Sequence, residues 1–193
     1  MIFVKTFTDI PFCEKEILRY AGCKTSNNRI NELLSDCKKE TENIFSYKVC
    51  YGEFDVNIKD NTCDFGVFKF NSKNLALNLK NCRTVIIFGA TVGIALDRLI
   101  QKYSITSPAK AVMLQAIGAE RIEALCDKFC EDLSKSRNIT FKPRFSAGYG
   151  DLPLETQKDI FRILDLERKI GLTLNNSLLM SPTKSVTAFA GII

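Results

Sequence analysis

The chain has 193 residues, 46% of them hydrophobic, which is enough to bury one substantial core, and we expect a single domain over residues 1–193. Its formal charge of +5 is spread along the chain among 22 acidic residues, without the basic stripe and interleaved aromatics that are typical of nucleic-acid binding. The sequence has no histidine, which excludes histidine-dependent catalysis, catalytic triads included.

The composition favours a cytoplasmic protein with reduced thiols. No stretch approaches the roughly 18 consecutive apolar residues of a membrane span, and the start, MIFVKTFTDIPF, lacks the basic-then-apolar order of a secretory signal. Eight cysteines are present, but they form no CxxC motif or zinc spacing, and the chain is longer than most disulfide scaffolds. Cys126 and Cys130 lie four residues apart on an expected helix, where small thiols pack as apolar side chains.

The first half of the chain is expected to contain two helices and then a β-rich stretch. Pro11 suits the first turn of a helix that ends at Gly22, and a second helix runs from about Asn28 to Lys39, where apolar residues recur at helical spacing. Next, the runs 46–56 and 64–70 are rich in β-branched and aromatic residues. They are separated by turn-forming residues, which predicts that they pair antiparallel.

A capped helix and a buried strand are predicted next. Ser72 can cap a short helix over residues 74–79, and the apolar run 82–91 indicates a central strand that ends at Gly89 and Gly93. These glycines lie in FGATVGIALD, where a strand, small residues and a helix start follow one another as in many phosphate-binding turns. A nucleotide-binding enzyme is therefore one hypothesis. Because no lysine follows the second glycine, close packing of strand against helix is the favoured interpretation.

The second half of the chain is expected to be mainly helical. Residues 93–133 have a helical pattern that is interrupted where Ser107 caps and Pro108 begins a longer helix. The segment 138–145 is predicted to be a strand and 146–153 a glycine-rich loop.

A last helix and a last strand complete the pattern. Residues 154–171 read as one helix closed by Gly171, and the apolar, β-branched segment 185–193 reads as a strand. Taken together, the elements predict an α+β fold with one bent, mainly antiparallel sheet covered by helices.

The loop after residue 143 combines groups that suit a flat, charged ligand. Arg144 can hold a carboxylate through two parallel hydrogen bonds, and Tyr149 can stack on a ring or approach a sulfonium. Between and after them, Gly148 and Gly150 permit close approach of the backbone. A glycine-rich turn with a surface ion pair explains the same residues equally well.

The sequence from this loop onward resembles a known family. The run RFSAGYGDLPLETQKDIFRILDLERKIGLTLNNSLLMSPTKSVTAFAGI is similar, without a gap, to the C-terminal signature of the activation domain of cobalamin-dependent methionine synthase. Upstream, GATVGIALDRLI and RIEALCDKFCEDL resemble segments of the same family, so the similarity is strongest over residues 82–193.

This resemblance implies a role and a ligand. In that family the domain binds S-adenosylmethionine and docks over a partner's cobalamin, which is trapped by methylation after reduction by one electron. The resemblance implies that Arg144 holds the ligand's carboxylate, Tyr149 flanks the ligand and Glu123 contacts its charged groups. The backbone of Ser146, Ala147 and Gly148 would line the adenosine. For Glu123, an ion-pairing residue on a helix surface is the alternative interpretation.

The resemblance also implies partners, and it has departures. The chain is expected to be a stand-alone form that serves a separate methionine synthase or corrinoid protein, with a flavodoxin or ferredoxin as electron donor and no nucleic acid or membrane as partner. Phe145 and Ala147 replace family prolines, Glu155 replaces a histidine that faces the cobalamin, and a late tyrosine has no counterpart. A corrinoid-protein docking module that no longer binds S-adenosylmethionine is therefore the alternative function.

Overall fold

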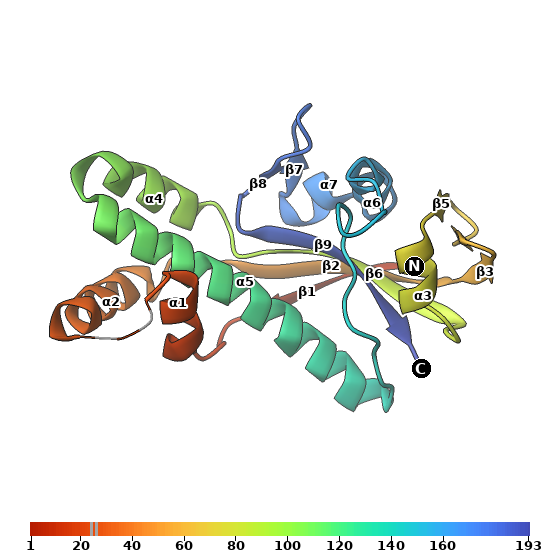
Figure 1. Ribbon diagram of the computed structural model, residues 1–193, viewed down its shortest axis with the longest axis horizontal. Helices are drawn as coiled ribbons and strands as arrows, with labels where there is room; N and C mark the ends of the chain where they lie inside the picture. Colours follow the sequence, from red (N-terminus) through yellow and green to blue (C-terminus); the bar gives the residue numbers. More distant parts are fainter. Residues whose placement is uncertain (24, 26) are drawn as a thin grey trace.

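The fold is built on a four-stranded antiparallel sheet, seen edge-on in Figure 1. The computed structural model describes residues 1–23, 25 and 27–193. The strand order is β1-β2-β6-β9, which joins the N-terminal segment to one edge and the C-terminal segment to the other. The strands are β1 (Ile2–Phe7), β2 (Tyr47–Asp55), β6 (Thr84–Thr91) and β9 (Ser185–Ile192). The predicted α+β class with a mainly antiparallel sheet is confirmed.

One face of the sheet is covered by four helices, which are α1 (Glu14–Tyr20), α2 (Asn28–Thr41), α4 (Ala95–Thr106) and α5 (Pro108–Arg137). Successive side chains of a strand point to opposite faces, and on this face β6 contributes Ile86, Phe88 and Ala90 to the core. The break that was predicted between two helices falls at Ser107, as expected. However, the side chain of Ser107 makes no capping hydrogen bond.

The other face is covered by shorter elements. They are α3 (Lys73–Asn78), α6 (Thr156–Leu164), α7 (Leu166–Ile170) and a small sheet of β3 (Asn57–Lys59), β4 (Thr62–Asp64) and β5 (Lys69–Asn71). On this face β6 contributes Val85 and Ile87 and β9 contributes Phe189 to a second core. A hairpin of β7 (Thr173–Leu174) and β8 (Met180–Ser181) leads from α7 into β9. Figure 1 shows α5 and α6 on opposite sides of the sheet.

The predicted pairing of residues 46–56 with 64–70 is wrong. β2 lies between β1 and β6, whereas β4 and β5 belong to the separate small sheet. A long, largely buried strand needs a long partner on each side to satisfy its backbone groups, and the three-residue strands are too short for that role. One of its partners is β1, an edge strand without a fully buried residue, which the sequence interpretation did not assign.

Two further expectations need correction. The helix expected over 154–171 is broken at Asp165, which takes a left-handed conformation with φ 52°, while Gly171 ends it as predicted. Gly89 lies inside β6 and does not end it. A glycine is needed there because the fully buried Leu166 packs directly against it: a Cβ at Gly89 would lie 2.7 Å from Leu166 Cδ1. Gly93 has φ +90° and a Cβ there would lie 3.0 Å from Ser46 Cβ, so close packing explains this glycine as well.

The segment 138–145 is not a regular strand. It runs along β9 through two isolated bridges, Phe141 with Ile192 and Phe145 with Phe189. Pro143 lies between the two bridges and has no N–H, so a continuous ladder does not form. This edge of the sheet is therefore only partly paired.

Five of the eight cysteines are buried. All eight cysteines are free thiols. Cys126 is fully buried in the core between α5 and the sheet, Cys130 packs against the same core, and burial raises the pKa of both thiols. In the described part of the chain, no helix has the length and apolarity to cross a bilayer.

Candidate functional site

A pocket of about 500 Å³ lies at the β9 edge of the sheet, and we call it the β9 pocket. Five of the residues singled out in the sequence line it, namely Glu123, Arg144, Ser146, Ala147 and Tyr149. The sixth, Gly148, is not among its lining residues. The pocket is completed by Pro143, Gln157, Met180, Val186 and Thr187. Residues from α5, α6, β8, β9 and one loop thus converge on one cavity.

The loop that forms one wall is held at its start by the sheet. Phe145 and Phe189 exchange two backbone hydrogen bonds of 2.9 and 2.8 Å, after which the chain turns away from β9. The N–H of Tyr149 donates to the carbonyl of Ser146 (3.2 Å), which closes a tight turn around Gly148 at φ +86°. Gly148 therefore supplies the turn conformation, which other residues rarely adopt.

The end of the loop is held by Asp151, which caps α3. Its carboxylate accepts hydrogen bonds from the Ser72 hydroxyl (2.5 Å) and from the N–H groups of Lys73 (2.7 Å) and Asn74 (3.2 Å). The hydrogen bond from Ser72 is the main cause that lowers the pKa of Asp151. Ser72 also accepts from the N–H of Leu75, so the predicted cap is confirmed. The anchoring of the loop to this cap was not foreseen.

Arg144 is held between two carboxylates of α5. Its guanidinium donates to Glu123 Oε2 at 2.8 Å and to Asp127 Oδ1 at 2.5 Å, and only 25% of its side chain is exposed. Burial disfavours the charged form, but the hydrogen bond to Asp127 and the two negative charges raise the pKa of Arg144, so it stays protonated. Glu123 and Asp127 lie four residues apart on one helix face. That spacing was the available signal for Asp127, which the sequence interpretation missed.

Two uncharged polar side chains of the β9 pocket are incompletely hydrogen-bonded. Among the described residues, three buried side-chain polar atoms have no hydrogen-bond partner, and two of them are Gln157 Oε1 and Thr187 Oγ1. Gln157 is 6% and Thr187 2% exposed. Leaving such a group unpaired costs about 1–3 kcal/mol. Neither residue was singled out, although Gln157 occupies the same helix face as the buried Ile160 and Leu164, where an apolar residue is expected.

The mouth of the β9 pocket is apolar and exposed. The side chain of Tyr149 is 67% exposed, and its ring lies 6.3 Å from that of Phe145. Leu154 and Leu179 are also exposed. The pocket thus combines an ion pair at one wall, uncharged polar groups at another and an aromatic ring at its mouth.

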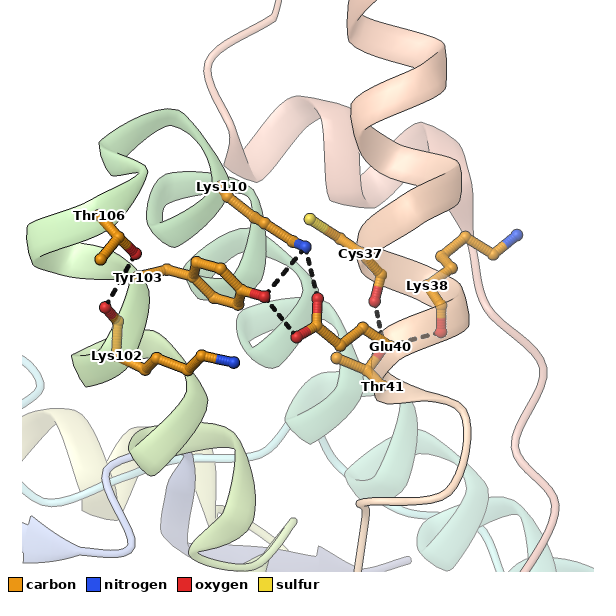
Figure 2. A network of polar contacts seen from close by, with 8 residues as sticks. All are labelled: Cys37, Lys38, Glu40, Thr41, Lys102, Tyr103, Thr106 and Lys110. Atoms are coloured by element: carbon orange, nitrogen blue, oxygen red, sulfur yellow. Dashed lines mark hydrogen bonds and ion pairs between the residues drawn. The ribbon is translucent and has the colours of Figure 1, made fainter.

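Two other polar clusters are complete within themselves. Figure 2 shows Glu40 of α2, which accepts a hydrogen bond from the Tyr103 hydroxyl (2.6 Å) and pairs with Lys110 at 2.5 Å. Closer to the sheet, the buried Glu120 and Arg121 pair at 2.5 Å. The first cluster ties α2 to α4 and α5, and the second ties the segment before α1 to α5. Neither lines the β9 pocket.

Comparison with known proteins places these observations in a family. The family model for the activation domain of vitamin B12 dependent methionine synthase matches residues 78–191, which include every residue that lines the β9 pocket. Among solved structures, the MetH reactivation domain bound to AdoHcy has the same fold, with a TM-score of 0.69 and 15% sequence identity over 99% of this chain and 78% of that chain. No curated protein matches the sequence. Because the family model covers more than half of its length, the chain belongs to the family of activation domains of vitamin B12-dependent methionine synthase.

Proposed function

We propose that this chain binds S-adenosylmethionine in the β9 pocket and assists reductive methylation of a cobalamin carried by a separate methionine synthase or related corrinoid protein. The observation that carries the proposal is the convergence of Glu123 of α5 with Arg144 and Tyr149 of the loop on one pocket. Its volume of about 500 Å³ is typical of small-molecule sites. Family membership and a solved domain of the same fold with bound AdoHcy support it further.

The charged wall of the pocket is complementary to the amino-acid end of this ligand. That end carries a carboxylate and an ammonium group. Arg144 would bind the carboxylate with its planar guanidinium, and Glu123 would accept the ammonium. Without ligand the two side chains pair with each other at 2.8 Å. Neither charge is therefore left unpaired in either state, which lowers the cost of keeping the site ready.

The remaining groups suit the nucleoside and the sulfonium. Backbone groups of Ser146 and Ala147 would line the adenosine, and the exposed ring of Tyr149 would approach the positive sulfur through cation–π attraction. When bound, S-adenosylmethionine supplies a methyl group on a sulfonium, which is already a good leaving group. The chain then needs only to hold and orient the ligand at the mouth of the pocket, and no general acid or base is required.

The partners follow from the same proposal. In this proposal the cobalamin is held by a separate methionine synthase or related corrinoid protein, because the family consists of activation domains of vitamin B12-dependent methionine synthase. The exposed Tyr149, which lines the pocket, and the exposed Leu154, which lies beside Gly148 of the same loop, would form part of the contact with that protein. The electron for the reductive step would come from a small redox protein such as a flavodoxin or ferredoxin.

The proposal is tested by isothermal titration of the protein with S-adenosylmethionine and S-adenosylhomocysteine. Saturable binding is expected, and Arg144→Ala should weaken it by about 10- to 150-fold, since a hydrogen bond to a charged group contributes about 1.5–3 kcal/mol. The matched control is Arg137→Ala, which removes another ion-paired arginine of the chain, bonded to Glu53 at 2.5 Å, outside the pocket. Its affinity should equal that of the wild type.

Two results would contradict the proposal in different ways. If the wild type gives no heat at millimolar ligand, the alternative of a docking module without S-adenosylmethionine is favoured. If Arg144→Ala binds as tightly as the wild type, the ligand lies elsewhere. Because Arg144 is three-quarters buried and not a freely exposed loop residue, thermal denaturation of both arginine variants must show that they are folded.

A further inference from the structure

The two incompletely bonded side chains of the β9 pocket lie on the same side of the sheet. Thr187 lies two residues before Phe189 in β9, so both side chains point to the same face of the sheet. Phe189 belongs to the core under α6 and α7 on that face. Gln157 is in the first turn of α6, and its face carries Ile160 and Leu164 of that same core. Both residues are more than nine-tenths buried, and both line the pocket. Both residues therefore contribute to the wall of one site.

The backbone of β9 adds hydrogen-bonding groups at the same place. The N–H and C=O of Phe189 point to the outer edge of the sheet, where they bond Phe145. In an antiparallel strand these groups alternate between the two sides, so those of Thr187 face the same edge. The chain has already turned away from β9 there, because the last bridge is at Phe145. The pocket thus offers both an amide side chain and a free strand edge to a flat, uncharged ligand group.

We infer that Gln157 and Thr187 recognise the adenine base and determine the specificity of the site for an adenine nucleoside. The inference rests on the proposed function and deepens it. The ion pair of Arg144 and Glu123 suits the charged end of the ligand, which leaves the uncharged polar wall for the base. A glutamine amide matches the N6/N7 edge of adenine through two hydrogen bonds, because its oxygen accepts from the exocyclic amine and its NH₂ donates to N7. On that edge inosine offers two acceptors and no donor, so the amide oxygen would be left without a partner. The hydroxyl of Thr187 can donate to or accept from the same base.

The decisive comparison is between S-adenosylhomocysteine and S-inosylhomocysteine, in which a carbonyl replaces the exocyclic amine. Calorimetric titration of the wild type should show a preference of about 5- to 150-fold for the adenosyl compound, the range expected for a paired amide contact. In Gln157→Met, which keeps the length of the side chain without its amide, the ratio of the two affinities should fall towards one. In Thr187→Val, the affinity for the adenosyl compound should fall about 2- to 10-fold.

The matched control is Gln115→Met, the same substitution at an exposed glutamine of α5 outside the pocket, which should leave both affinities unchanged. Thermal denaturation without ligand separates a binding role from a structural one. Because Gln157→Met and Thr187→Val each remove a buried polar atom that lacks a partner, both variants should be at least as stable as the wild type.

Each outcome of these experiments has one meaning. Lost preference in Gln157→Met together with undiminished stability supports the inference. A wild type that binds both compounds equally, or a Gln157→Met variant that is less stable and keeps the preference, overturns it while the proposed function stands. A wild type that binds neither compound overturns the proposed function, and the inference with it.

Discussion

The Glu120–Arg121 cluster and the Gln157–Thr187 pair of the β9 pocket are both buried, and they differ in whether their hydrogen bonds are complete. On the α5 face, Arg121 is fully buried; it donates to both carboxylate oxygens of Glu120, to the carbonyl of Pro11 at 2.6 Å and to that of Ile10. Glu120 in turn accepts from the N–H of Cys13 at 3.1 Å. At the β9 pocket, the buried oxygens of Gln157 and Thr187 have no hydrogen-bond partner in the described part of the chain.

The difference separates a structural role from a binding role. The guanidinium of Arg121 also stacks 4.1 Å from the ring centre of Phe12, so this cluster fixes the segment between β1 and α1 against α5. Its two charges are paired with each other inside the folded chain. The β9 pocket differs, because Gln157 and Thr187 each bury an oxygen without a partner, which destabilises the folded chain. In the proposal above, a bound ligand supplies these partners. Burial of a polar side chain is thus not by itself a sign of a binding site. A buried polar side chain that lacks a hydrogen-bond partner and lines a pocket, as Gln157 and Thr187 do, is a better indication.

The largest effect is expected from breaking the complete cluster. Arg121→Met should lower the free energy of unfolding by about 3–5 kcal/mol, because it leaves the Glu120 carboxylate buried without its counter-charge. Urea denaturation measures the loss. The control Arg19→Met, which removes an exposed arginine paired with Glu16, should show no measurable change. A variant of Arg121 with wild-type stability would contradict the structural role assigned to this cluster.

An intermediate, pH-dependent effect is expected at the cluster of Figure 2. Hydrogen bonds from Lys110 and then from Tyr103 lower the pKa of Glu40 below its ordinary value of 4.5. The folded state therefore gains stability from the carboxylate above that value and loses it as the pH falls through the lower, folded-state pKa. Glu40→Gln should cost about 1 kcal/mol at pH 7, and the difference from wild type should shrink towards pH 3.

Urea denaturation at the two pH values measures this difference. The exposed neighbour Glu42 provides the control variant Glu42→Gln, which should follow the wild type at both. A Glu40→Gln difference that stays constant between pH 7 and pH 3 would show that the carboxylate does not carry the stabilisation.

The smallest effect is expected at the anchor of the pocket loop. Asp151→Asn replaces one accepting oxygen by an NH₂ group and so weakens the bonds to Ser72, Lys73 and Asn74 that hold the end of the loop. The affinity for S-adenosylhomocysteine should fall about 2- to 10-fold, the cost of ordering one or two additional groups on binding. Titration calorimetry checks this, with the exposed Asp55→Asn as control. An unchanged affinity would mean that the loop does not need this anchor.

Much of the local structure could be predicted from the sequence because its causes are local. The apolar run of β6, the cap at Ser72, the break before Pro108 and the end at Gly171 all depend on a few neighbouring residues. The pocket residues Arg144 and Glu123 were found through resemblance to a family, which carries three-dimensional information that one sequence lacks. From local chemistry alone, an ion pair and a ligand contact were equally good explanations of Arg144.

The sequence by itself therefore determined most of the helices, the burial of the central strand and the family, since periodicity, capping residues and matching motifs are all properties of short segments. Only the tertiary structure decided that β2 pairs with β1 and β6, and that Leu166 occupies the space beside Gly89. It also decided that Arg121 is satisfied while Gln157 is not. Whether a buried polar atom has a partner depends on residues more than a hundred positions away, as between Arg121 and Pro11, and no local pattern records that distance.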